Sequence, residues 1–260
     1  MNYINASRSQ DTNMPFNTLA KSFDIIDLLL KSKVDLSVIE ISKELKMPKS
    51  TTYKYLAVLR DKGFLEYDSV AGTYLLGFKF LELASVVQAQ SRLDKIAYPY
   101  MKKLFLETRE TIILSVLKFD QAYCLERIEG EGGIVFSMQR GSHLPLHCGA
   151  SAKVLLAFSD EDIDSLLNAG PLKKYTKYTN IDPIIIKKQL EEIRKLGYAY
   201  TDQEVDIGAR AIAAPIINRQ RKLAGGLCIV GPIQRMSDDR LKTLKKLVMN
   251  YAKAISEEVL

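Results

Sequence analysis

The sequence predicts an α+β protein in which a small N-terminal domain of three helices and a β-hairpin precedes a larger domain of mixed strands and helices. Its 260 residues exceed what one small core needs, and 47% hydrophobic with 26% charged residues is the balance of a globular chain. Helical periodicity dominates the first part, whereas strand-like and helical runs alternate later. We expect a mobile arm, a winged helix-turn-helix domain, a linker helix and a larger domain over residues 1–15, 16–77, 78–91 and 92–260.

Charge and cysteine content narrow the class of protein. No stretch approaches about eighteen uninterrupted apolar residues, and the N-terminus lacks the apolar run of a secretory signal, so we expect a cytoplasmic protein without a membrane partner. Three widely spaced cysteines, Cys124, Cys148 and Cys228, predict reduced, buried thiols. The net charge of +6 is compatible with an anionic partner. Between residues 43 and 62 the acidic Glu44 and Asp61 are outnumbered by Lys43, Lys46, Lys49, Lys54, Arg60 and Lys62.

Three helices are predicted in the N-terminal domain. The second begins at Ser37, which with Glu40 three residues later forms a capping box. The third follows Pro48 and turns Leu56 and Leu59 toward a core. The first helix is expected to bury a stripe made of Leu19, Phe23, Ile26 and Leu30.

The third helix is polar and basic at its leading end, which is suitable for contact with DNA. In a helix-turn-helix the second helix of the pair puts its N-terminal side chains against base edges in the major groove. After Gly63, β-prone runs at 64–67 and 73–76 flank a turn and predict a wing. A charged helix face alone is common, but three helices, a wing and a basic cluster in this order favour DNA binding. The predicted DNA-binding residues are Lys49, Ser50, Thr51, Tyr53 and Lys54.

The remaining chain predicts a mixed sheet covered by helices. A helix from Leu93 carries one apolar stripe and is expected to kink at Pro99. Further helices are expected over residues 150–158, 160–168 with Ser159 as its cap, 182–197, and from 237 onward. Strands are expected over residues 111–118, 121–129, 134–139, 198–201, 211–217 and 223–230.

The larger domain offers little catalytic chemistry. His143 and His147 are separated by Pro145, so they do not share a helix face. A zinc site formed by His143, His147 and Cys148 stays an alternative, but its spacing matches no known motif, and core or loop positions are the preferred interpretation of these residues. Ser151 lies outside any Gly-x-Ser-x-Gly elbow, and no basic residue adjoins a cysteine. We therefore expect no enzyme activity, no cofactor and no metal.

The run from Met47 to Leu56, together with further motifs from Leu144 onward, resembles the IclR family of bacterial transcriptional regulators, and the resemblance extends from about Asn17 to the end of the sequence. The run from Met47 to Leu56 resembles its recognition helix, with Lys54 where many members carry Arg, which leaves phosphate contact open. The downstream matches are Leu144 to His147, Ala150 to Ala157, Gly197-Tyr198, Glu204, Gly208, Ala213 to Ile216, Gly231-Pro232 and Arg235.

The resemblance implies a GAF-like effector-binding domain and a linker helix that helps pair subunits. It implies a regulator, more often a repressor, that binds a pseudo-palindromic operator in double-stranded DNA as a homodimer or dimer of dimers, in the cytoplasm at the nucleoid. A small-molecule effector would control its operator affinity. The implied effector-binding residues are Gly149, Ala150, Thr201, Ala211, Cys228 and Val230.

A set of small residues leaves space for a ligand, but it would also permit close helix-on-sheet packing; the set is Gly149, Ala150, Ala211, Gly225 and Gly226. Several members carry acidic or hydroxyl groups where this chain has Thr201, Cys228 and Val230, so we expect a less polar effector. Two alternatives stay open: a thiol-dependent enzyme of the GAF type, and a constitutive DNA binder that has lost ligand sensing.

Overall fold

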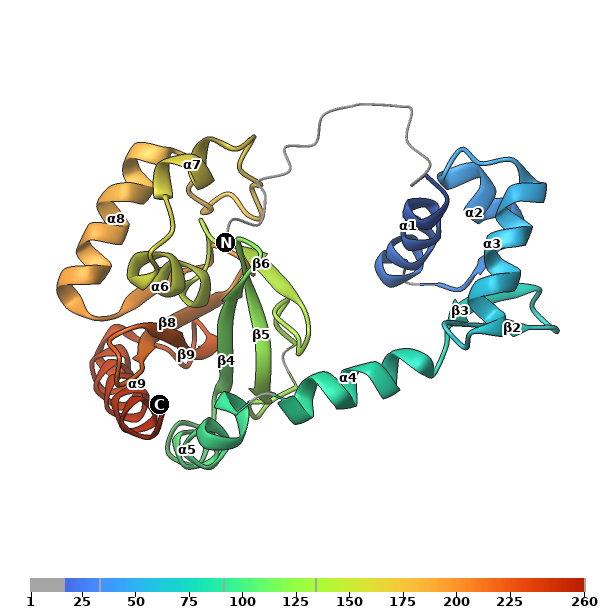
Figure 1. The fold of residues 1–260 in the computed structure, drawn as a ribbon. Helices are drawn as coiled ribbons and strands as arrows, with labels where there is room; N and C mark the ends of the chain where they lie inside the picture. The colour runs from blue at the N-terminus through green and yellow to red at the C-terminus, as the bar shows by residue number, and fades with distance from the viewer. Residues whose placement is uncertain (1–16, 33, 91, 134, 260) are drawn as a thin grey trace. The chain divides into compact units, whose positions relative to one another are not determined.

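The computed structural model describes residues 17–32, 34–90, 92–133 and 135–259, which form two compact units divided after Gln90 (Figure 1). The predicted mobile arm, residues 1–15, lies outside the described residues. Among the described helices, none is both long enough and apolar enough to cross a membrane.

The N-terminal unit contains the expected helix-turn-helix and wing. The predicted hairpin is confirmed as an antiparallel pair in which Tyr67 lies opposite Tyr74. A two-residue strand, Leu36–Ser37, adds a third strand to this sheet and was not predicted, because two residues are too few for a periodic signal. The elements are α1 (Asn17–Lys31), β1 (Leu36–Ser37), α2 (Val38–Glu44), α3 (Lys49–Asp61), β2 (Leu65–Asp68), β3 (Thr73–Leu76) and α4 (Lys79–Gln90).

Helix α1 buries a different face from the one predicted. Leu19, Phe23 and Leu30 are 61%, 57% and 67% exposed, so their assignment to the core is wrong. Ile25 and Leu29 are buried instead, in a core with residues of α2, α3 and the wing, and Ile26 is partly buried. The helix has two overlapping apolar stripes, and periodicity alone does not decide which one packs.

The capping box at the start of α2 is confirmed. The Ser37 side chain accepts a hydrogen bond from the Glu40 backbone N–H at 3.4 Å, and the Ser37 backbone N–H donates to Glu40 Oε2 at 2.8 Å. Ser37 also lies in β1, so it joins the sheet to the first helix of the DNA-binding pair.

Substituting Ser37 by Ala removes this cap, and we expect it to lower the free energy of unfolding of the N-terminal unit by about 1 kcal/mol. Urea denaturation of the full chain checks this through the transition of that unit. Ser69→Ala in the exposed wing turn is the matched control. Equal midpoints for the two variants would contradict the prediction.

Helix α4 is largely apolar, and it is exposed from Leu81 to Val87. Leu81, Leu83, Val86 and Val87 are all exposed, and none belongs to a hydrophobic core of the described chain. The helix begins at Lys79, one residue later than expected, and Lys79 Nζ lies 2.8 Å from Glu82 Oε2 at its start. Phe80 in the first turn packs against Phe64, but burial within the unit does not stabilise the segment from Leu81 to Val87.

A six-stranded antiparallel sheet organises the C-terminal unit, in the order β6-β5-β4-β9-β8-β7. The strand predicted over 134–139 is wrong. Residues 135–139 form no strand, and the strand at this edge of the sheet is His143–Pro145 instead. Phe136 and Met138 are buried from an irregular segment, and such alternation of buried residues imitates a strand. The strands are β4 (Thr111–Lys118), β5 (Gln121–Ile128), β6 (His143–Pro145), β7 (Ala199–Asp202), β8 (Ala209–Ile217) and β9 (Leu223–Pro232).

Helices cover both faces of this sheet, so the unit has three layers (Figure 1). The expected α7 start is wrong: Asp162 rather than Ser159 caps this helix, accepting from the backbone N–H groups of Asp164 and Ser165. The other helices confirm the sequence prediction to within a few residues. They are α5 (Leu93–Thr108), α6 (Ala150–Phe158), α7 (Ile163–Asn168), α8 (Pro183–Leu196) and α9 (Asp238–Glu258).

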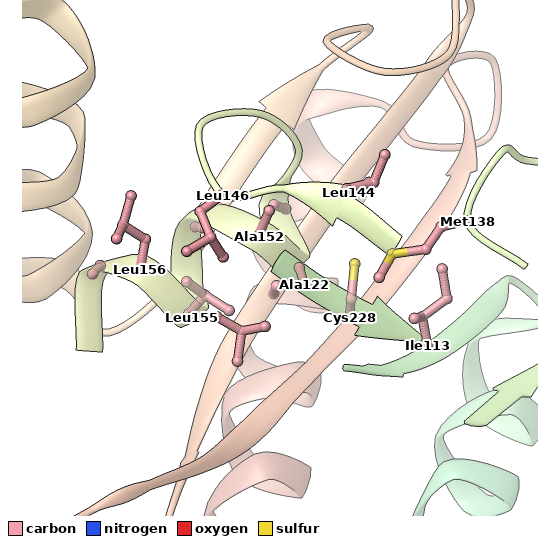
Figure 2. Close-up of a cluster of buried hydrophobic side chains, with 14 of the residues drawn as sticks. Ile113, Ala122, Met138, Leu144, Leu146, Ala152, Leu155, Leu156 and Cys228 are labelled. Atoms are coloured by element: carbon pink, nitrogen blue, oxygen red, sulfur yellow. The ribbon is translucent and has the colours of Figure 1, made fainter. Parts of the chain in front are cut away.

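Successive side chains along each strand point to opposite faces of the sheet, and each face has its own hydrophobic core. Ile112 and Leu114 of β4 pack with α5 and α9 on one face, whereas Ile113 between them packs with α6 on the other. Figure 2 shows part of this second core, whose members include Ile113, Ala122 and Cys228 of the sheet together with Ala152, Leu155 and Leu156 of α6. Four of the residues that the family resemblance assigns to the effector site belong to this second core or pack against it: Ala150, Ala211, Cys228 and Val230.

A buried carboxylate joins α5, the end of β9 and α9. Glu110, fully buried, accepts hydrogen bonds from Arg235 Nε at 2.9 Å and Nη2 at 2.6 Å. Arg240 Nη1 lies 2.9 Å from the same carboxylate, and its Nη2 donates to the Thr108 carbonyl at 2.5 Å. A side chain at Gly231 would come within 2.6 Å of Glu110 Oε2, so this position requires glycine.

Candidate functional site

The leading turns of α3 form the first candidate site, a nucleic-acid interface. Lys49, Ser50, Tyr53 and Lys54 are exposed, and Thr51 is half-buried. The opposite face of α3 packs inward through Thr52, Leu56 and Leu59. The structure thus brings all five predicted DNA-binding residues to one end of the helix, with side chains available to a partner.

Local backbone chemistry adds to the positive character of this end. Helix α3 follows Pro48 and has no side-chain cap, so the first backbone N–H groups are left for an external acceptor. The helix dipole and these N–H groups favour a phosphate there. Lys43 and Lys46, both exposed, flank the same turn. Sequence reasoning noted these two lysines as part of the basic cluster but did not assign them to the site.

The wing differs from α3 in charge, because its strands and turn carry no basic residue. Asp68 Oδ1 accepts hydrogen bonds from the backbone N–H groups of Val70 and Ala71 at 2.8 and 3.1 Å, and Gly72 completes the turn with a φ of 71°. Val70 is 97% exposed at the tip. No Lys or Arg occurs from residue 65 to residue 76, so the cations of the interface are carried by α2 and α3 rather than by the hairpin.

The second candidate site is a cavity of about 50 Å³ between the start of α6 and the strands β7, β8 and β9. All six residues predicted to bind an effector lie in its lining: Gly149, Ala150, Thr201, Ala211, Cys228 and Val230. Strand register explains why they meet. Thr201 lies opposite Ala211, and Ala211 lies opposite Val230, so three adjacent strands present these side chains on one face.

Sequence reasoning missed nine further lining residues. Phe136 and Met138 come from the segment that was predicted as a strand, and Figure 2 shows Met138 beside Ile113 and Cys228. The alternating hydrophobic residues of this segment were the available signal. The same alternation is typical of a β-strand, so it does not show that the segment lines a cavity. The complete set is Ile113, Phe136, Met138, Leu144, Ser151, Glu204, Val205, Asp206 and Ala209.

The N-terminus of α6 opens onto this cavity without a side-chain cap of its own. Gly149 has a φ of 82°, and a Cβ there would lie 3.0 Å from Val205 Cγ2, so both backbone conformation and space require glycine. The Gly149 backbone N–H donates to Glu204 Oε2 at 3.0 Å. Thr201 is 5% exposed, and its hydroxyl makes no hydrogen bond within the described part of the chain.

A buried ion pair between Lys153 of α6 and Glu204 lies next to the N-terminus of this helix. Lys153 Nζ is 2.5 Å from Glu204 Oε1 and donates to Gln189 Oε1 at 2.9 Å. The Lys153 side chain is 2% exposed and that of Glu204 is 10% exposed. Removing one partner of such a pair would leave an uncompensated charge in the interior.

The cysteine and histidine residues have the properties of core groups. Burial raises the pKa of Cys124 and of Cys148 to about 12, and that of Cys228 to about 11. Burial also lowers the pKa of His147, whose Nε2 lies 2.9 Å from the Lys173 carbonyl. Within the described ranges, no three His, Cys, Asp or Glu side chains are grouped so as to hold a metal ion.

We expect iodoacetamide to leave all three cysteines of the folded protein unmodified, because the reagent needs an accessible thiolate and these thiols are buried with raised pKa values. Mass spectrometry should find three modifications only after unfolding in denaturant. Rapid modification of Cys228 in the native state would contradict the prediction and would support the alternative of a thiol-dependent enzyme.

A winged helix-turn-helix with an exposed basic recognition helix, followed by a separate sheet domain with an internal cavity, defines a two-domain DNA-binding regulator. The family description "IclR helix-turn-helix domain" matches residues 18–69, and "Bacterial transcriptional regulator IclR C-terminal" matches residues 86–257. The chain belongs to the IclR family of transcriptional regulators, as the sequence resemblance implied.

Curated relatives and solved structures agree over nearly the whole chain. The regulator KipR of Bacillus subtilis is 31% identical over 243 residues, covering 93% of this chain and 96% of KipR. The repressor IclR of Escherichia coli is 28% identical over 242 residues, covering 92% of this chain and 88% of that protein. The crystal structure of Thermotoga maritima IclR is 30% identical with a TM-score of 0.75, covering 94% of this chain and 99% of that one.

Proposed function

We propose that this protein is a repressor that binds a pseudo-palindromic operator as a homodimer or dimer of dimers and that a small-molecule effector changes its operator affinity. The main support for the DNA-binding site is that the start of α3 is exposed and places Lys49 and Lys54 beside backbone N–H groups that no side chain caps. The relatives IclR and AllR of Escherichia coli are named as repressors, which supports the direction of regulation. The site of action is the nucleoid in the cytoplasm.

Two exposed apolar surfaces of the N-terminal unit support the proposed pairing of subunits. One is the stripe of Leu19, Phe23 and Leu30 on α1, and the other is the exposed side of α4. Because the N-terminal unit by itself leaves both surfaces in water, a second copy that covers them would gain free energy from burial. In this proposal residues 16–77 read DNA, the helix over 78–91 links and pairs subunits, and residues 92–260 bind the effector.

The cavity beside α6 supports an effector site with an apolar body and few polar groups. Among the described lining residues the Thr201 hydroxyl is available for a hydrogen bond, and most other lining groups are hydrophobic. A volume of about 50 Å³ holds little more than water, so an effector would have to displace the side chains of Phe136 or Met138. It can shift operator affinity only by the difference in its affinity for the two states of the regulator.

The test of the proposed function uses DNA from upstream of the gene for this protein. We expect the full chain to protect an inverted repeat in footprinting, with half-sites about one helical turn apart, and to sediment as a dimer or a larger assembly. A reporter fused to this DNA should be less active when the protein is present. Binding without any inverted repeat by a monomer would overturn the proposal.

A library of small molecules, screened for an increase in the melting temperature, tests effector control in the same preparation. We expect hits to change the affinity for the DNA and to be lost in Ala211→Leu, which fills the cavity. A protein that binds DNA but responds to none of the molecules would be a constitutive binder.

A further inference from the structure

Two charged side chains hold the irregular segment that lines one side of the cavity. Phe136 and Met138 belong to the lining and are 4% and 5% exposed, although residues 135–139 form neither helix nor strand. Such a segment has no ladder of backbone hydrogen bonds, so its position depends on the side chains that bond to its backbone. Arg127 of β5 and Asp206 of the connection between β7 and β8 make these bonds.

Arg127 holds the segment through two carbonyl groups. Its side chain is 3% exposed, and its Nη1 donates to the backbone carbonyls of Phe136, at 3.4 Å, and of Met138. Its Nε and Nη2 pair with the two carboxylate oxygens of Glu129 at 2.7 and 2.8 Å. This bidentate ion pair fixes the plane of the guanidinium group, so Nη1 stays directed at the two carbonyls.

Asp206 holds the residue between them. Its Oδ2 accepts a hydrogen bond from the Ser137 backbone N–H at 3.0 Å, and its Oδ1 accepts one from the Ser137 hydroxyl. In the sheet, β4 and β9 lie between β5 and the pair β8 and β7, and they carry Ile113 and Cys228 of the cavity lining. The segment is therefore attached on both sides of these two strands, which agrees with the position of Met138 beside Ile113 and Cys228 in Figure 2.

We infer that Arg127 and Asp206 are positioning residues that control access to the cavity, because they hold Phe136 and Met138 in its lining. The inference rests on the proposed effector site and adds how a ligand enters it. A volume of about 50 Å³ admits little more than water, so entry of a larger molecule requires the segment to move and these hydrogen bonds to break. Weakening either attachment should open the cavity more often while the sheet stays folded.

A purely structural role for these bonds makes a different prediction. Their loss would then destabilise the C-terminal unit as a whole, and its buried thiols would become accessible together. The chain contains its own reference for this case. Cys228 belongs to the cavity lining, whereas Cys148 is equally buried but is not among the described lining residues. The rate of modification of Cys228 relative to that of Cys148 therefore separates opening of the cavity from unfolding.

Treatment of the full chain with iodoacetamide, followed by mass spectrometry of its peptides, measures this relative rate. In Arg127→Met we expect it to rise at least about tenfold over wild type, because hydrogen bonds from a charged donor are lost. Arg140→Met is the matched control. It removes a neighbouring arginine that pairs with Glu126 at 3.0 Å, and it should leave the relative rate unchanged. Equal relative rates in wild type, Arg127→Met and Arg140→Met would overturn the inference.

Ser137→Ala tests the attachment to Asp206 without leaving a buried group unpaired. Ser137 is exposed, so its replacement should not disturb the core, and we expect the relative rate at Cys228 to rise at least about threefold. This variant decides the question if Arg127→Met modifies Cys148 and Cys228 equally fast, which would mean that Arg127→Met has lost its fold. An unchanged relative rate in Ser137→Ala would then overturn the inference.

The control of access and the proposed effector site fail in different ways. Stabilising molecules whose effect is lost in Ala211→Leu, together with unchanged relative rates in Arg127→Met and Ser137→Ala, keep the effector site and overturn the control of access. Raised relative rates, together with stabilising molecules that Ala211→Leu leaves effective, keep the control of access and overturn the assignment of the cavity as the effector site.

Discussion

Replacing Lys49 and Lys54 together by Ala is expected to weaken DNA binding at least about tenfold at physiological salt, with the fold of the N-terminal unit retained. Both side chains are exposed at the start of α3, so their removal leaves no cavity in the core. Each lysine that neutralises one phosphate adds about one unit to the slope of log affinity against log salt. The variant should therefore show a slope smaller by about two units per bound subunit.

Fluorescence anisotropy at several salt concentrations measures both quantities, with the upstream DNA and with an unrelated duplex of equal length. Because phosphate contacts carry no base information, the loss should be similar on the two duplexes. Lys31→Ala/Lys79→Ala removes two cations from the same unit outside α3 and is the matched control. Equal affinity and slope for wild type and Lys49→Ala/Lys54→Ala would exclude α3 as the recognition helix.

Replacing Arg235 and Arg240 together by Ala is expected to lower the free energy of unfolding of the C-terminal unit by about 3 kcal/mol or more. Glu110 is fully buried, and these two guanidinium groups supply its charged partners. Their loss leaves a carboxylate without compensation in the interior, which costs far more than breaking an exposed ion pair. The loss is a large part of the stability of an ordinary domain.

Adding Glu110→Gln to this variant is the informative rescue. Gln keeps nearly the same shape and removes the charge, so part of the lost stability should return if unpaired charge is the cause. Lys246→Ala/Lys253→Ala removes two exposed cations from α9 and controls for net charge. Urea denaturation follows all four proteins, and a double Arg variant no less stable than this control would contradict the argument.

The sequence predicted the fold where local chemistry and packing agree. The capping box at Ser37 and the proline and glycine bounding α8 were correct, because caps and glycine with positive φ are local requirements. The core stripe of α1 was wrong, because Leu19 and Phe23 satisfy the same periodicity as Ile25 and Leu29. Choosing between two apolar faces needs the position of the rest of the domain, which one helix does not encode.

The lining of the candidate cavity was also predicted only in part. Family resemblance placed Gly149, Thr201 and Cys228, and the strand register brings them together. Glu204 was noted as a family match without a role, because nothing local indicates that its carboxylate reaches the Gly149 N–H fifty-five positions away. Contacts between distant segments of the chain are the part of a site that periodicity and spacing do not reveal.

The hydrogen bonds of Asp68 across the hairpin tip have a consequence for how the N-terminal unit meets a partner. Both N–H groups that shape the turn are satisfied before any partner arrives, so contact at Val70 requires little ordering of the backbone. The hairpin carries Asp68 and Val70 near its tip and no Lys or Arg. We therefore expect any contact that it makes with DNA to depend on the shape of the groove and not on charge. Changing Val70 should then alter which sequences are preferred while leaving the ionic-strength dependence of binding as it was.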